Sequence, residues 1–188
     1  VDLPGIFKAM TKYTTLATTP KEAAIGTQLA LKHAISGRPG PTAVVMRSKS
    51  IIGDVDLEQP PFIHDTSGYL NMGRTQAMPG DVDRAVGLLT KAKRPVIVAG
   101  NGARVGGAAN TIRSFAEAWG IPVATSYKGK SVVEETHPLA LGMAGVYGTK
   151  AANTAVADAD VILVVGAMLR WQDTLREKPT VWNPKSQK

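Results

Sequence analysis

Short apolar runs alternate with amphipathic stretches along most of the chain. The apolar runs predict β-strands, and they lie at residues 42–46, 96–99, 121–125 and 161–165. The amphipathic stretches repeat their apolar residues at helical spacing, at residues 19–36, 81–94, 106–119 and 149–157. Because strands separated by helices usually pair in parallel through right-handed crossovers, the pattern predicts an α/β fold.

Start and stop signals bound several of the predicted helices. Thr19-Pro-Lys-Glu22 has the form of a capping box with proline at the first helical position. Gly37 and Gly120 stand where helices are expected to end, the usual place for a terminal glycine. The predicted helix 81–94 begins with acidic residues and carries basic residues in its last turn, at Lys91, Lys93 and Arg94.

Three stretches lack a sustained period. Residues 1–18 are expected to form loop and a short strand, and residues 126–147 a glycine-punctuated loop with a turn of helix near His137-Pro138. Residues 47–79 are too long for a structureless loop inside one compact domain. We therefore expect three parts. Residues 1–50 form an α-β piece of one α/β domain, and residues 51–79 form a linker. Residues 80–188 form a doubly wound, nucleotide-binding-like domain that is incomplete at its C-terminus.

Composition narrows the protein class. The hydrophobic share of 44% and charged share of 20% are those of a soluble globular protein, without a run long enough to span a bilayer. The absence of cysteine excludes disulfides, thiolate metal sites and a cysteine nucleophile. The net charge of +7 is spread along the chain without aromatic interleaving, so it favours an anionic ligand over nucleic acid. The N-terminus has no signal-peptide pattern, and the abrupt ends suggest a piece of a longer chain.

A glycine turn at Gly100-Asn101-Gly102 follows one predicted strand and precedes a helix. In that setting the glycines allow a tight turn and a close approach of the backbone to a ligand phosphate. An NAD-binding unit also needs a carboxylate about 20 residues on, at the tip of the next strand. The tip reads Thr125-Ser-Tyr-Lys128, so an NAD dehydrogenase is disfavoured.

Turns after three predicted strands, at Gly100, Ser126 and Gly166, are expected to line one crevice. Ligands of doubly wound sheets bind beyond the carboxyl ends of the strands. The alternative is that these are ordinary connecting loops. The three histidines lack metal-ligand spacing, and the chain contains no Gly-x-Ser-x-Gly elbow and no Walker A pattern. The residues by themselves therefore indicate a nucleotide-type α/β domain and no catalytic machinery.

A collinear set of motifs covers nearly the whole chain, at residues 10–13, 19–22, 36–45, 93–103, 120–124, 136–138, 142, 145, 148, 152–153, 159–160 and 165–166. The first three resemble the end of the pyrimidine-binding domain of thiamine-diphosphate enzymes of the acetolactate synthase type. The others resemble the central domain of the same family.

The resemblance implies a specific chemistry for the longer protein. In such enzymes the thiamine ylid adds to the carbonyl of a 2-oxo acid, and decarboxylation gives an enamine that is protonated or attacks a second carbonyl. The resemblance places the cofactor-activating glutamate before Val1 and the Gly-Asp-Gly motif for Mg²⁺ and diphosphate after Lys188. We therefore expect no catalytic and no metal-binding residue in this chain, and no activity from its 188 residues alone.

The family's central domain binds FAD in some members and ADP in others. The positions that match its nucleotide-binding turns are Gly100, Asn101, Gly102, Ser126, Tyr127, Lys128, Gly145, Val146, Tyr147, Gly166, Ala167 and Met168. Several of these turns depart from the FAD-binding pattern. The run 166–171 looks closer to members that act on acyl-CoA substrates.

Two other interpretations stay open. The chain could be a nucleotide-binding α/β module without chemistry of its own, or part of a member resembling 2-hydroxyacyl-CoA lyase or oxalyl-CoA decarboxylase. A basic nucleic-acid-binding protein ranks lowest. For the full-length protein we expect a cytoplasmic homo-dimer or homo-tetramer that acts on a small 2-oxo acid and has no nucleic-acid or membrane partner.

Overall fold

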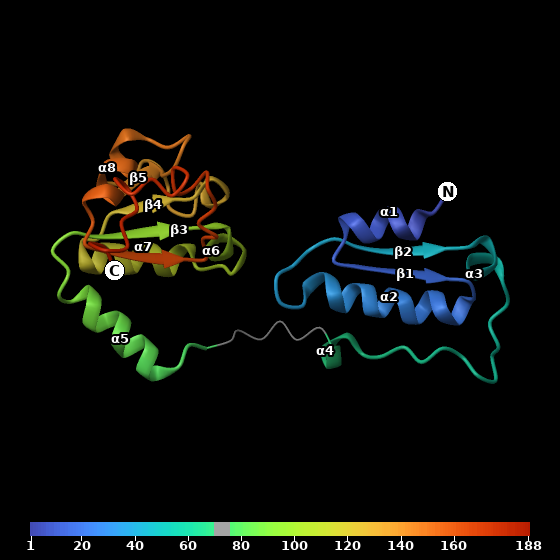
Figure 1. Cartoon of the computed structure of the whole chain (residues 1–188). Coiled ribbons are helices and arrows are strands. Elements are labelled where there is room, and N and C mark those ends of the chain that lie inside the picture. Colours follow the sequence, from blue (N-terminus) through green and yellow to red (C-terminus); the bar gives the residue numbers. More distant parts are fainter. Residues whose placement is uncertain (70–75) are drawn as a thin grey trace. The chain divides into compact units, whose positions relative to one another are not determined.

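The computed structural model describes residues 1–69 and 76–188, and residues 70–75 of the expected linker lie outside them. The chain divides into two compact units, unit 1 (Val1–Gln76) and unit 2 (Ala77–Lys188), shown in Figure 1. The division falls inside the stretch that carries no hydrophobic period.

Unit 1 contains one pair of parallel strands. Its elements are α1 (Leu3–Met10), β1 (Tyr13–Ala17), α2 (Pro20–Ile35), β2 (Thr42–Met46), α3 (Ser48–Ile52) and α4 (Thr66–Tyr69). The register runs from Tyr13 opposite Thr42 to Ala17 opposite Met46, and both α1 and α2 pack against the pair.

Two short helices of unit 1 correct the sequence-based assignment. The expected loop at the N-terminus contains α1, because the Asp2 side chain accepts a hydrogen bond from the Gly5 amide (3.0 Å) and Pro4 occupies the first turn. The helix α3 occupies the start of the stretch expected to lack structure, and its amide at Ser50 hydrogen bonds to the Arg47 carbonyl. Both helices are too short for the hydrophobic period to reveal them.

The cap of α2 forms largely as the sequence predicts. The Thr19 hydroxyl accepts from the Glu22 amide at 3.2 Å, and Gly37 adopts a left-handed φ of +56° after the helix. The reciprocal bond is displaced by one residue, since the Glu22 carboxylate accepts from the Thr18 amide (2.7 Å) rather than from that of Thr19.

Unit 2 is a parallel α/β sheet, which confirms the predicted fold class. Its elements are α5 (Pro79–Leu89), β3 (Pro95–Ala99), α6 (Asn101–Val105), α7 (Ala109–Trp119), β4 (Val123–Thr125), η1 (Tyr127–Gly129), β5 (Ala140–Met143), α8 (Lys150–Asp158) and β6 (Val161–Val165). The strand order is β5-β4-β3-β6, and every pair is parallel. The chain therefore winds outward from β3 to β5 and then returns to the other side of β3, so the winding reverses between β3 and β6.

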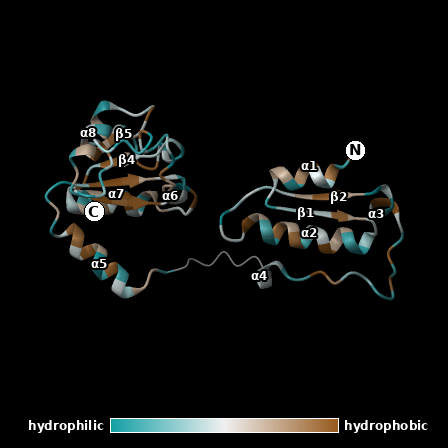
Figure 2. Cartoon of the chain, in the orientation of Figure 1, coloured by the Kyte–Doolittle hydropathy of each residue, from teal (hydrophilic) through white to brown (hydrophobic). Residues whose placement is uncertain are grey.

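Both faces of this sheet are buried, as doubly wound folds require. One face carries Ile97 and Val123 against Ile112 of α7, and the other carries Val98 against Val156 of α8. Figure 2 shows hydrophobic residues gathered along the strands of this sheet. Since both faces are covered, the strands read as continuous apolar runs rather than as alternating ones.

Unit 2 also corrects several boundaries. The helix α5 ends at Leu89, so Lys91, Lys93 and Arg94 follow it instead of forming its last turn. A strand, β5, occupies part of the stretch 126–147 that was expected to be loop, and the turn of helix lies at Tyr127–Gly129 rather than near His137. The segment Ala140–Met143 includes Gly142, whose φ is +81°. A glycine is unfavourable inside a strand, so its presence weakens the sequence pattern that would predict β5.

Candidate functional site

The turns after all four strands of unit 2 lie at one edge of the sheet. The strands are parallel, so their carboxyl ends meet there, and the winding reverses between β3 and β6 at the same edge. These turns contain every residue that the sequence predicted for a nucleotide site. We call this edge the carboxyl edge, formed by residues 100–104, 126–129, 144–148 and 166–173.

The turns after β3 and β6 are in direct backbone contact. A Cβ at Gly100 would lie 2.3 Å from the Cα of Ala167, and a Cβ at Gly102 would lie 2.9 Å from the Cα of Gly166. Gly166 itself has a φ of +60°, and a Cβ there would lie 2.3 Å from the Ala103 nitrogen. Glycine is required at these positions because two stretches of backbone touch.

This contact engages two main-chain amides of the glycine turn. The Gly100 amide donates to the Val165 carbonyl and the Gly102 amide donates to the Gly166 carbonyl, each at 2.8 Å. Those two N–H groups are therefore satisfied by the protein. An anionic ligand at the carboxyl edge would need other donors.

Asn101 lies at the start of α6 and orients a cation. Its side-chain oxygen accepts from the Arg104 guanidinium, at 2.9 Å from Nη2 and 3.2 Å from Nε. The helix that follows the glycine turn is thus the short α6, whereas the sequence placed the helix after Gly106 and Gly107.

A buried carboxylate joins the turns after β4 and β6. Asp173 is 7% exposed, and its Oδ1 accepts from the Tyr127 amide at 3.1 Å. Its Oδ2 accepts from the Arg170 amide at 3.2 Å. A buried charge is tolerated only where hydrogen bonds compensate its lost hydration, and each oxygen of Asp173 has such a bond.

The turn after β5 is held from two sides. Asn153 of α8 accepts from the Gly145 amide (2.8 Å) and donates to the Gly145 carbonyl (3.0 Å). From the other side, the Gln172 carbonyl accepts from the Val146 amide at 2.8 Å. A Cβ at Gly145 would lie 2.2 Å from that carbonyl oxygen, and the φ of +103° also favours glycine there.

Side chains of the predicted site residues differ in exposure. Tyr127 and Tyr147 are 61% and 66% exposed, and their ring centroids lie 6.2 Å apart. Lys128 is also exposed, whereas Ser126 is buried. The exposed aromatic rings and cations give the carboxyl edge the chemistry of a surface for an anionic aromatic ligand.

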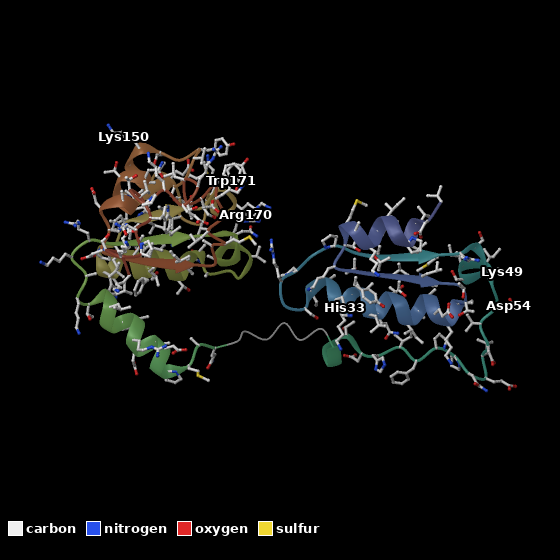
Figure 3. All side chains as sticks on the ribbon, in the orientation of Figure 1. His33, Lys49, Asp54, Lys150, Arg170 and Trp171 are labelled. Atoms are coloured by element: carbon white, nitrogen blue, oxygen red, sulfur yellow. The ribbon has the colours of Figure 1, made fainter. Side chains whose placement is uncertain are left out.

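The segment after β6 adds two further side chains to this edge. Arg170 and Trp171 lie on the side of unit 2 toward which β3 and β6 point (Figures 1 and 3). The Arg176 guanidinium lies over the Trp171 ring, 5.4 Å from its centroid. Arg170 is half-buried, and its Nε lies 3.0 Å from the Met168 sulfur.

Sequence reasoning therefore found the turns but missed two residues that hold them. Asp173 lies after the last predicted strand, in a stretch for which the sequence predicts no helix or strand. Asn153 belongs to a motif that resembles the family, but the sequence does not show that it hydrogen bonds to Gly145. No sequence pattern points to Asp173, because it lies eight residues beyond the end of β6 at Val165.

The remaining candidates for chemistry are ordinary surface groups. In the part of the chain that the structure describes, no three His, Cys, Asp or Glu side chains gather so that they could hold a metal ion. His137 contacts the Glu117 carboxylate at 3.0 Å, and Lys130 contacts Glu135 at 3.4 Å. In unit 1, a groove of about 430 Å³ lies along α2, between Leu29 and Phe62.

Comparisons with known proteins agree with this architecture. Residues 82–188 match the model of the family described as "Thiamine pyrophosphate enzyme, central domain". A probable acetolactate synthase large subunit of Methanocaldococcus jannaschii is 37% identical over 168 residues, 88% of this chain and 28% of that protein. The acetolactate synthase isozyme 2 large subunit of Escherichia coli is 32% identical over 184 residues, 98% of this chain and 32% of that protein.

A relative named for another activity matches as well. The 2-hydroxyacyl-CoA lyase 1 of Dictyostelium discoideum is 33% identical over 153 residues, 80% of this chain and 25% of that protein. The chain thus spans between a quarter and a third of the length of these three relatives. With the matched model covering most of unit 2, the chain belongs to the thiamine pyrophosphate enzymes.

Proposed function

We propose that this chain is part of a thiamine-diphosphate-dependent enzyme that acts on 2-oxo acids, of the acetolactate synthase type. The observation that carries the proposal is the collinear match of both units to acetolactate synthase large subunits. In this arrangement residues 1–50 form the end of the pyrimidine-binding domain, residues 51–79 the linker, and residues 80–188 the central domain.

The thiamine and magnesium sites belong outside this chain. The sequence contains no Gly-Asp-Gly motif, and its described residues form no cluster of metal ligands. We propose that the catalytic residues also lie in the remainder of the longer protein. Thiamine-dependent decarboxylation of a 2-oxo acid by the purified 188-residue chain, with thiamine diphosphate and Mg²⁺ supplied, would contradict this assignment.

The role proposed for unit 2 is to bind FAD or ADP at the carboxyl edge. The exposed rings of Tyr127 and Tyr147 could stack on an adenine, and Arg104, Lys128 and Arg170 supply positive charge. Because the Gly100 and Gly102 amides are already used, the phosphates would be bound chiefly by these side chains. Bound FAD would bring a redox-active flavin, whereas ADP would bring only charge and shape.

Mass spectrometry of the ligand released from the purified full-length protein tests this role. Release of FAD or ADP in near-stoichiometric amount is the expected result. A protein that carries neither, and that binds neither when each is added, would leave the carboxyl edge without the proposed ligand.

Two observations favour a second candidate reaction. The run Gly166-Ala-Met-Leu-Arg-Trp171 resembles members that act on acyl-CoA substrates, and a relative is named 2-hydroxyacyl-CoA lyase. In that case the full-length enzyme would cleave a 2-hydroxyacyl-CoA, or decarboxylate oxalyl-CoA, instead of joining two 2-oxo acids. Assays of the full-length protein with pyruvate and with an acyl-CoA substrate separate the two reactions.

The cellular setting is a further part of the proposal. Within the described residues, no helix has both the length and the apolar character that crossing a bilayer demands. We propose a cytoplasmic homo-dimer or homo-tetramer that binds a small 2-oxo acid and neither nucleic acid nor membrane. Light scattering of the full-length protein in solution measures the oligomeric state.

A further inference from the structure

Asp173 is the buried carboxylate of unit 2 whose position no motif predicted. It lies eight residues beyond the end of β6 at Val165, and it bonds to amides of two different segments, at Tyr127 and Arg170. Its two bonds, of 3.1 and 3.2 Å, therefore join these segments through one buried side chain. The carboxylate therefore fixes the turn after β4 against the segment after β6.

The residue before it extends the same connection to a third turn. The Gln172 carbonyl accepts from the Val146 amide, and its oxygen lies 2.2 Å from where a Cβ at Gly145 would be. Three of the four turns at the carboxyl edge thus meet at the dipeptide 172–173. The exposed rings of Tyr127 and Tyr147, which we propose as ligand contacts, stand directly on two of these turns.

The backbone on both sides of the dipeptide is held in an unfavourable conformation. Leu169 has a φ of +50°, and three consecutive residues at 175–177 have φ between +53° and +61°. Left-handed conformations are unfavourable for residues with a Cβ, and they persist where surrounding contacts hold them. The contacts of Asp173 and of Gln172 lie between these two strained stretches.

We propose that Asp173 is the positioning residue of the nucleotide site, which rests on the function proposed for unit 2. It holds the turns that carry Tyr127 and Tyr147 in one arrangement without touching the ligand. Its carboxylate is required rather than an amide, because both of its oxygens face N–H donors. An asparagine would turn its own NH₂ group toward one of them.

Asp160 offers a matched control at the opposite end of the sheet. Its carboxylate likewise accepts from two main-chain amides, those of Lys93 (2.7 Å) and Arg94 (2.9 Å). It precedes β6, where no predicted site residue lies. Asp160→Asn likewise turns an NH₂ group toward one of two main-chain amides of unit 2, at a more exposed position. It therefore reports what such a substitution does to unit 2 away from the carboxyl edge.

The experiment compares Asp173→Asn and Asp160→Asn in the full-length protein, well below their melting temperatures. Binding of ADP and of FAD, each added alone, is measured by calorimetry, and hydrogen exchange is followed over residues 126–129 and 145–148. For Asp173→Asn we expect about tenfold weaker nucleotide binding, about 1.4 kcal/mol, and faster exchange in both turns. For Asp160→Asn we expect affinity within about twofold of wild type and faster exchange only near residues 93–94.

Each result decides between defined alternatives. If wild type binds a nucleotide and Asp173→Asn binds it equally well, the positioning role is wrong while the nucleotide site stands. Equal weakening in both variants shows a general loss of stability and also overturns the role. If wild type binds neither ADP nor FAD, the proposed function of unit 2 fails, and the role of Asp173 fails with it.

Discussion

The main-chain amide of Tyr127 donates to the carboxylate of Asp173 across 3.1 Å, although 46 residues separate the two in sequence. The bond connects the end of β4 with the segment that follows β6, which are not neighbours in the sheet. It shows that the carboxyl edge is held together by contacts between turns as well as by the strands beneath them. The predictions below test these contacts and those that define the two units.

Gly166→Ala is expected to destabilise unit 2 by at least about 2 kcal/mol. The new Cβ would lie 2.3 Å from the Ala103 nitrogen, and the backbone is left-handed there. Gly87→Ala in α5 is the matched control, since nothing lies within 4 Å of a Cβ at that position. It should stabilise the helix by about 0.5–1 kcal/mol. Thermal unfolding of both variants measures the difference, and a similar loss in both would contradict the backbone contact.

Asp160→Asn is expected to change how stability depends on pH. The hydrogen bond from the Lys93 amide, reinforced by that from Arg94, lowers the pKa of Asp160 below its ordinary value, while partial burial opposes the shift. A lowered pKa in the folded state contributes stability at neutral pH, which is lost as the pH falls through the folded pKa, below about pH 4. Denaturant unfolding between pH 7 and pH 2 should show lower stability at pH 7 and a shallower acid limb in the variant. An acid limb identical to that of wild type would refute the prediction.

Thr19→Ala is expected to destabilise α2 by about 1 kcal/mol. The substitution removes the side-chain oxygen that accepts from the Glu22 amide. Thr27→Ala in the same helix is the control, because the Thr27 hydroxyl only bonds back to the Ala23 carbonyl and alanine favours a helix. Hydrogen exchange over residues 20–35 should rise in the first variant and stay level or fall in the second. Equal exchange in the two variants would mean that the cap contributes nothing.

Tyr147→Ala is expected to weaken nucleotide binding by the full-length protein about tenfold, a typical value for loss of a stacking ring. Because the ring is 66% exposed, the melting temperature without ligand should hardly change. Tyr147→Phe keeps the ring and should keep the affinity. If the phenylalanine variant loses as much affinity as the alanine variant, the hydroxyl rather than the ring makes the contact.

Much of the fold was predictable because it depends on local signals. The runs 96–99 and 161–165 became β3 and β6, and Gly120 adopted the left-handed φ of +63° expected after a helix. The elements that the sequence did not predict are short. α1, α6 and β5 are too brief for a hydrophobic period to emerge, and their boundaries follow from caps and strand neighbours.

The meeting of these turns at one edge of the sheet was predictable, and the contacts between the turns were not. The sequence shows Gly100, Ser126 and Gly166 after strands, and parallel winding alone brings such positions to one edge. It does not show that Gly102 faces the backbone of Gly166, because the same glycines would serve a phosphate equally well. The partner of each amide depends on which turn lies nearby.

The amino-acid sequence by itself determined the α/β class, the strands of the main sheet and the family to which the chain belongs. These follow from apolar periodicity, glycine and proline punctuation, and ordered motifs, all of which are local along the chain. Only the tertiary structure decided that Asp173 binds the Tyr127 amide and that Gly100 rests on Ala167. Those contacts join segments more than 40 residues apart, and a buried polar group takes whichever partner the folded chain brings within hydrogen-bonding distance.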